Sequence, residues 1–238
     1  MRARAVVLAV AIGALALVAT PAASAATHEC DGLMVCVPIA GPWVVVPTAG
    51  TLTPRPHVEY QLDCPRGYVV GGLDAELSNR AIDVSFAGGL GSPVNPGITT
   101  TRSAVFIATY AGPPGAPAAT VRPRIGCIPA SGGGGRVPTS VSAVYPPGHP
   151  ATRRVRSLAV LPGAARVMQA CASGERLLAA SHAIGFYTQR PPGNALVAAV
   201  RTRQSVAGTR VSVSVRAAKA ISGVRTEVQV SAVCGGGR

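Results

Sequence analysis

The sequence predicts an all-β protein made of two tandem antiparallel β-sandwich units, each with one internal disulfide. Three observations carry this prediction. The chain is rich in Val, Ala, Gly and Pro, a composition that favours strands and turns over helices. Short segments alternate apolar with polar residues, as half-buried strands do. A Cys-x-x-Gly pattern occurs twice, at 64–67 and at 171–174.

The first 25 residues have the three parts of a secretory signal peptide. Arg2 and Arg4 give a positive start, residues 5–19 are almost wholly apolar, and Ala-Ser-Ala at 23–25 supplies a small-x-small cleavage site. The apolar run is shorter than the ~20 residues that a membrane-spanning helix needs. We therefore expect residues 1–25 to be removed, and the mature protein to be secreted without a transmembrane segment.

A tandem duplication accounts for the repeated Cys-x-x-Gly. Cys64 and Cys127 are 63 residues apart, and so are Cys171 and Cys234. In each copy, two strand-like runs separated by a turn lead into the first cysteine. The sequence leaves open whether the two copies pack together. The predicted segments are a first unit at 26–128, a Gly-rich linker at 129–140 and a second unit at 141–238.

Alternation places the cysteines on buried faces. Val58, Tyr60 and Leu62 share the parity of Cys64, and the strands that end at the later cysteines of each copy alternate in the same way. An even number of cysteines in an exported chain favours disulfides. Parity and equal spacing together select one pairing. The predicted disulfides are Cys64–Cys127, Cys171–Cys234 and Cys30–Cys36.

Gly-, Pro- and Asn-rich turns separate the remaining strand-like runs, and no segment has the pattern of an amphipathic helix. Short strands with regular turn signals are typical of β-sandwiches. The expected strands in chain order lie at 43–47, 57–64, 68–75, 81–88, 104–112, 121–127, 158–162, 165–171, 176–186, 195–206, 209–218 and 225–234.

The repeated motif carries a resemblance. The first copy reads CPRGYVVGG at 64–72 and is closed by a later strand ending in cysteine; it resembles modules of uncharacterised secreted actinobacterial proteins. The run at 171–192, with its closing VQVSAVC, is similar to the C-terminal part of members of that group. The second copy departs from the motif at Ala172 and at Ala179-Ala180. The resemblance implies export and a disulfide-bonded β-fold, and it implies no activity and no catalytic residues.

Charge is distributed unevenly along the chain. Residues 26–138 hold seven Arg and seven acidic residues and are neutral, whereas residues 139–238 hold twelve Arg and Lys219 against Glu175 and Glu227, which gives 13 − 2 = +11. We therefore expect the two units to have unlike surfaces.

Four arginines of the second unit lie on a predicted hairpin. Residues 195–206 and 209–216 are expected to pair about a turn at 207–208, with Val206 opposite Thr209. In this register serines lie between the arginines on one face, and valines form the other. We weigh two interpretations of the arginine face: a solvated outer surface and an anion-binding surface. The candidate anion-binding residues are Arg201, Arg203, Arg210 and Arg216.

Catalytic motifs are scarce in this sequence. Gly-x-Ser-x-Gly, His-Glu-x-x-His, Ser-x-x-Lys and a phosphate loop are all absent. His182 shares parity with apolar neighbours, which favours a hydrogen-bonded structural histidine over a general base. Asp74 and Glu76 have the spacing of a carboxylate pair, but the nine aromatic residues are too few to favour a sugar-stacking cleft. No catalytic residue, metal site or cofactor is therefore predicted.

The function expected from these features is that of a secreted, non-catalytic binding or structural module, extracellular or associated with the cell envelope. Acidic envelope polymers and anionic lipid headgroups are the expected partners. No specific nucleic acid is expected, because no aromatic residues interleave with the hairpin arginines for base stacking. Two alternatives remain: a secreted hydrolase with a loop-built site, and a secreted enzyme inhibitor that presents a rigid loop such as 91–97. The oligomeric state is left open.

Overall fold

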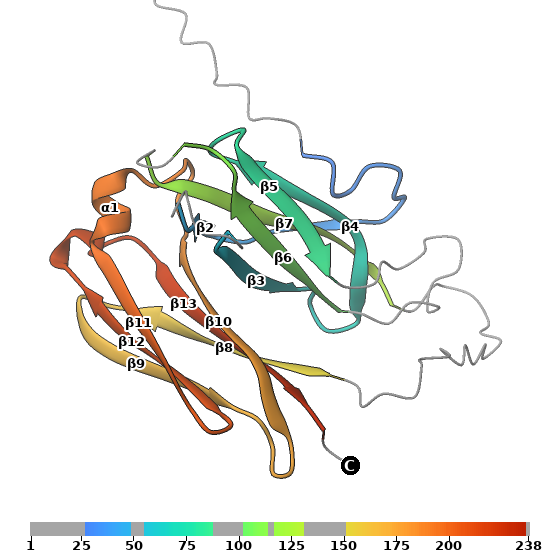
Figure 1. The fold of residues 1–238 in the computed structure, drawn as a ribbon. Coiled ribbons are helices and arrows are strands. Elements are labelled where there is room, and N and C mark those ends of the chain that lie inside the picture. Colours follow the sequence, from blue (N-terminus) through green and yellow to red (C-terminus); the bar gives the residue numbers. More distant parts are fainter. Residues whose placement is uncertain (1–26, 49–54, 88–101, 114–116, 131–150, 237–238) are drawn as a thin grey trace, which may run out of the picture.

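The computed structural model describes residues 27–48, 55–87, 102–113, 117–130 and 151–236, which form three β-sheets (Figure 1). The prediction of an all-β protein is confirmed. The first half contains β1 (Val37–Ala40), β2 (Trp43–Val46), β3 (His57–Asp63), β4 (Tyr68–Leu77), β5 (Ile82–Ala87), β6 (Ser103–Tyr110) and β7 (Ala119–Pro129). The second half contains β8 (Thr152–Val160), β9 (Gly163–Ala170), β10 (Arg176–Phe186), α1 (Asn194–Ala198), β11 (Val200–Ala207), β12 (Arg210–Ala217), a 3-10 turn (Lys219–Ile221) and β13 (Thr226–Gly235).

Some predicted segments lie outside the described residues. These are the signal peptide at 1–25, the part of the linker at 131–140 and the loop at 91–97. In the part of the chain that the structure describes, no helix has the length and apolar character needed to cross a membrane.

The prediction of a strand over 195–206 is wrong at its start, because α1 occupies Asn194–Ala198 and β11 begins at Val200. The helix is a single turn in which the N–H of Val197 donates to the carbonyl of Gly193 at 3.1 Å. Leu196 and Val197 pack against the core of the second half. Tertiary packing on this apolar pair thus favours a helical turn in a segment that also suits a strand.

One seven-stranded sheet runs through both halves of the molecule. Its order is β1-β7-β2-β10-β13-β8, and β4 also pairs with β7. The two halves join where β2 pairs antiparallel with β10, with Trp43 opposite Phe186 and Val44 opposite Gly185. The question that the sequence left open is thereby answered, because the halves share one sheet.

The pairing of the first half recurs in the second. β7 pairs with β2 and β4, and β6 pairs with β3 and β5; in the same way β13 pairs with β8 and β10, and β12 pairs with β9 and β11. The register shift in β4, between Val70 and Gly72, matches the shift in β10 between Leu177 and Ala179. Along β4 and β10, positions 107 residues apart, which is also the separation of Cys64 from Cys171, therefore have the same place in the sheet.

Each small sheet buries apolar side chains against the large sheet. In the second half, valines of β12 pack against Phe186 and the valines of β13. In the first half, β3 and β6 pack against Val44 and Val46 of β2 and against β7. Trp43 of β2 is also buried, at 3% exposure. Alternation along β3, β7 and β13 places apolar residues inside: Val58, Tyr60, Val121, Ile125, Val228, Val230 and Ala232 are buried. Leu62, predicted to face the same way, is partly buried.

The polar face of β13 is buried as well, contrary to the pattern expected of a half-buried strand. Gln229 and Ser231 are only 6% and 4% exposed. Strand β3 of the first half covers Gln229: the Gln61 N–H donates to Gln229 Oε1 at 2.7 Å, and Gln229 Nε2 donates to the Gln61 carbonyl at 3.0 Å. Ser231 Oγ accepts from Arg153 Nη1 at 2.8 Å. A side-chain amide thus satisfies the backbone edge of β3, where a neighbouring strand would otherwise be needed.

Glu59 of β3 links three segments at the junction of the halves. Its Oε2 accepts from Arg153 Nη1 at 2.7 Å and from Ser181 Oγ at 2.9 Å. Burial acts to raise the pKa of this carboxyl, but the hydrogen bonds from Arg153 and Ser181 and the charge of Arg153 outweigh it and lower the pKa. The charged form is therefore favoured by the fold.

The lowered pKa of Glu59 predicts an acid-sensitive junction. The stabilisation is fully present above the ordinary glutamate pKa, and it is lost as pH falls below that value and through the lowered pKa of the folded state. Glu59→Gln should destabilise the protein by about 2 kcal/mol at neutral pH and flatten the fall of melting temperature on acidification. Thermal melts of the parent, this variant and the exposed control Asp83→Asn measure the difference. Identical pH profiles for Glu59→Gln and the parent would contradict the assignment.

Two glycines let the N-terminal segment lie against the large sheet. A Cβ at Gly72 or Gly126 would come within 1.9 or 2.0 Å of the Glu29 carbonyl oxygen. Glu29 is 2% exposed, and its Oε1 is 3.2 Å from Arg124 Nη1. The last glycine of the CPRGYVVGG motif, Gly72, therefore permits a close backbone approach.

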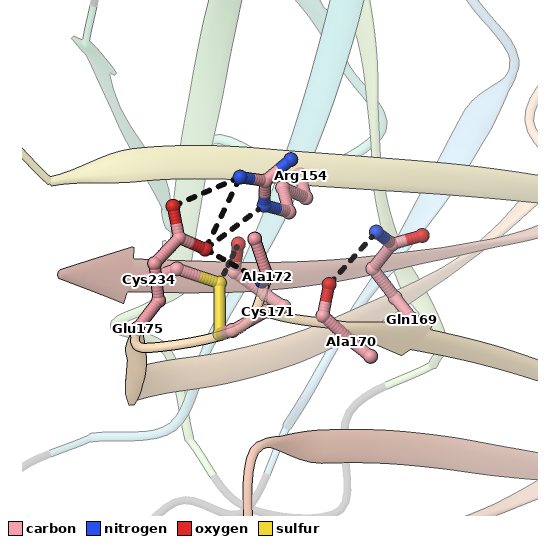
Figure 2. The surroundings of a disulfide bond; sticks show 8 residues. Arg154, Gln169, Ala170, Cys171, Ala172, Glu175 and Cys234 are labelled. Atoms are coloured by element: carbon pink, nitrogen blue, oxygen red, sulfur yellow. Dashed lines mark hydrogen bonds and ion pairs between the residues drawn. A yellow bond between two sulfur atoms is a disulfide. The ribbon is translucent and has the colours of Figure 1, made fainter. Parts of the chain in front are cut away.

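The structure contains the three predicted disulfides, Cys30–Cys36, Cys64–Cys127 and Cys171–Cys234. Figure 2 shows the surroundings of the last, where the Glu175 carboxylate lies between Arg154 and the turn after Cys171. Arg154 Nη2 donates to Glu175 Oε1 at 2.9 Å, and the Ala172 N–H donates to Oε2 at 2.7 Å. These bonds lower the pKa of Glu175 and hold the turn beside the disulfide.

Candidate functional site

The outer face of the β11–β12–β9 sheet carries the four arginines singled out from the sequence. All four are exposed, whereas the alternate residues of β12 are buried against the large sheet. The sheet therefore has a charged outer side and an apolar inner side. The exposed residues are Arg201, Arg203, Arg210 and Arg216, and the buried ones are Val211, Val213 and Val215.

The predicted register of this hairpin is wrong by two residues. Ala207 lies opposite Arg210, whereas Val206 had been expected opposite Thr209. The connection is the two-residue turn Gly208-Thr209, and Gly208 has a φ of 57°. A glycine with positive φ at the first turn position suits a two-residue hairpin. Because side chains alternate with a period of two, a shift of two residues keeps every side chain on its predicted face.

The corrected register brings the arginines closer together than expected. Arg201 lies directly opposite Arg216, and Arg203 lies opposite Ser214. On the other side of β12, Ser214 pairs with Arg166 of β9. Two neighbouring rows of the sheet thus carry four guanidinium groups around the exposed hydroxyl of Ser214.

Arg166 is a further arginine of this face, which the sequence pattern of the hairpin does not include. It is exposed and lies on the same face as the hairpin arginines, and its Nη2 donates to Ser212 Oγ at 2.9 Å. The sequence indicates that Arg166 faces outward, because it alternates along its strand with Val167, which is buried. Its pairing partner could not be deduced, since β9 joins β12 across 39 intervening residues.

Within the described residues, none of the four hairpin arginines forms an ion pair. Both acidic residues of the second half have other partners. Glu175 is held by Arg154, and Glu227 accepts hydrogen bonds from Tyr60 and Tyr187. Burial and the charge of Glu227 raise the pKa of both tyrosines, which therefore remain protonated donors. The positive charge of the outer face is not neutralised by these glutamates.

The dimensions of the face suit an extended anion. Arg210 and Arg216 are six residues apart on one strand, which corresponds to about 20 Å. The guanidinium fork donates two parallel hydrogen bonds to phosphate, sulfate or carboxylate groups. A chain of repeated anionic groups can therefore contact several arginines at once.

His182 has the structural role that its parity favoured. Its Nδ1 lies 2.8 Å from Gln204 Oε1, and its Nε2 lies 2.8 Å from Thr202 Oγ1. Gln204 Nε2 donates to the Ala180 carbonyl at 3.2 Å, which directs Oε1 toward the histidine. The ring thus ties β10 to the inner side of β11.

Asp74 and Glu76 lie on β4 and each has a partner. Asp74 accepts from the His28 N–H at 2.8 Å, and Glu76 forms an ion pair with Arg124. The two carboxylates therefore hold the N-terminal segment and the neighbouring strand β7, a structural role.

Of the described residues, Cys171, Glu175 and Cys234 form one cluster with atoms of metal-ligand type within 4.8 Å of one another. Both sulfurs belong to the disulfide, so neither can act as a thiolate ligand. The cluster therefore does not suit a metal in the oxidised protein.

The fold and the face together define a disulfide-bonded all-β protein with a basic sheet surface. No protein-family model matches the chain, and no curated protein or solved structure matches it.

Proposed function

We propose that this is an exported, non-catalytic binding module that holds an acidic polymer on the outer face of the β11–β12–β9 sheet. One observation carries the proposal: four exposed arginines share one face and none of them is ion-paired within the described residues. A surface that serves only to keep a protein soluble carries positive and negative residues side by side. A face with arginines and no acidic residue among them therefore favours a binding role.

For this function we propose an architecture of two tandem β-sandwich units, at 26–128 and 141–238. The Cys-x-x-Gly motif supports it through its resemblance to modules of secreted actinobacterial proteins. The repeated strand pairing supports this division, and so do the two disulfides of equal spacing. Export is supported by the signal-peptide pattern and by three disulfides, which persist in oxidising compartments.

The two units have unlike faces at equivalent positions. The positions in the first unit that correspond to Arg201 and Arg216 by strand pairing are Asp83 and Thr109, which lie opposite each other. The counterpart of Arg166, by the 107-residue offset, is Glu59. The arginines therefore belong to the second unit alone, which supports a division of roles between a neutral supporting unit and a basic binding unit.

An acidic polymer fits this face better than a lipid surface does. Membrane-surface binding combines cations with a large buried apolar area. On the outer face, Met168 is the one large apolar side chain among the described residues of β9, β11 and β12 that lies in register with the arginines.

The wild-type protein should bind a linear polyanion such as polyphosphate with a strong dependence on salt. If four arginines each release about 0.7 of a counterion, as for a single-stranded polyanion, affinity falls roughly fiftyfold between about 50 mM and about 200 mM salt. Calorimetric titration at several salt concentrations measures the slope, and vesicles of anionic lipid provide the competing surface. Tight binding to vesicles with no binding to polyphosphate would favour the lipid alternative over the polymer.

A further inference from the structure

A second site lies where the two halves meet. A cavity of about 540 Å³ is lined by β2 and β3 on one side and by β10 and β11 on the other. Its volume is within the roughly 300–1,000 Å³ of small-molecule sites, which commonly form between domains. We propose that this cavity binds a small molecule with one anionic head group and a short apolar tail, which is a function beyond the arginine face.

The floor of the cavity is apolar. Val45 and Val58 come from the first half, and Ala183 and Ile184 come from the second. Val58 and Ala183 are buried in the core, so this surface is part of the packed interior of the molecule. Such a floor suits a short hydrocarbon chain, which gains about 0.8 kcal/mol for each methylene removed from water.

The mouth of the cavity carries one guanidinium group, that of the exposed Arg55. His57, which is also exposed, lies two residues further along, at the start of β3. The lining contains no carboxylate; the neighbouring Glu59 accepts hydrogen bonds from Arg153 and Ser181 through Oε2, and its Oε1 lies 3.6 Å from His57 Nε2. A single arginine with no carboxylate in the lining favours a ligand with one negative group over a cation or a neutral molecule.

The polar wall is already ordered. The His182 ring is hydrogen-bonded to Thr202 and to Gln204. Gln204 donates one amide N–H to the Ala180 carbonyl, so the second amide N–H of Gln204 remains for a ligand. A donor fixed before binding loses little rotamer freedom when a ligand arrives. β11 therefore has two uses: Thr202 and Gln204 line this cavity, and Arg201 and Arg203 face the opposite way.

Octanoate, octyl phosphate and octanol test the site by calorimetry. Octanoate and octyl phosphate should each bind saturably to one site, and the ligand with the lower Kd identifies the preferred head group. Octanol, which has no charge, should bind about tenfold more weakly than either. Arg55→Gln should weaken both anionic ligands about tenfold and leave octanol unchanged, whereas the exposed control Arg66→Gln should match the parent.

Ala180→Met fills the cavity and should abolish binding of all three probes, while the exposed control Ala179→Met on the same strand should bind as the parent does. Circular dichroism establishes that each variant is folded. Absence of saturable octanoate binding to the parent, or unchanged binding by Ala180→Met, would overturn the proposal. A variant without the hairpin arginines should still bind octanoate, so failure of this site is distinguishable from failure of the polymer-binding face.

Discussion

Replacing Arg201, Arg203, Arg210 and Arg216 with serine should abolish binding of polyphosphate at physiological salt. The loss of four charge-assisted contacts removes both the hydrogen bonds and the released counterions on which affinity depends. The melting temperature should change little, because all four side chains are exposed and substitutions at such positions usually cost less than about 0.5 kcal/mol. Calorimetric titration and thermal melts of the same samples measure both quantities.

A matched control separates the site from the total charge. Serine replacement of four arginines elsewhere lowers the net charge equally, and the control should keep most of the affinity. These four exposed positions are Arg66, Arg80, Arg156 and Arg176. If both variants lose the same affinity, binding depends on net charge and the outer face is a solvated surface.

Removing either long disulfide should destabilise the protein strongly. Cys64–Cys127 and Cys171–Cys234 each span 63 residues. Closing a loop of this length stabilises the folded state by about 4 kcal/mol in the chain-entropy model, and because the loops are equal the two costs should be equal. Total stabilities of about 5–15 kcal/mol leave little margin for such a loss. Urea denaturation of the two double Cys→Ala variants provides the comparison.

The short disulfide is the internal control for this prediction. Cys30–Cys36 spans six residues, so its removal should cost only about 2 kcal/mol by the same model. A Cys171→Ala/Cys234→Ala variant that unfolds at the urea concentration of the parent would contradict the role given to this bridge. If removing the short bridge leaves the urea midpoint unchanged, the dependence on loop length holds only when removing either long bridge lowers the free energy of unfolding.

Local sequence patterns predict much of this fold. Parity along β3 and β13 places Tyr60, Val228 and Cys234 inside, and equal spacing selects the cysteine pairs. The arginine face could be predicted for the same reason, since alternation depends only on neighbouring residues. The two-residue error in register leaves the face unchanged, because the period of a strand is two.

Long-range pairing could not be predicted from the same patterns. Gln229 alternates like a solvent-facing residue, yet it is buried by β3, which is 168 residues away from it at Gln61. The cavity between the halves depends on the same junction, because His57 and His182 line it from different halves. Single-strand periodicity carries no information on which distant strand covers a face.

Arginine side-chain NMR tests the central claim most directly. In a protein labelled with 15N-arginine, titration with a short polyphosphate should shift the Nε–Hε signals of Arg201, Arg203, Arg210 and Arg216 together, with one saturation curve. The signals of Arg66 and Arg80 in the neutral half should stay in place. Saturable shifts centred on Arg66 and Arg80, with the hairpin arginines unmoved, would contradict the assignment of the β11–β12–β9 face as the anion-binding surface.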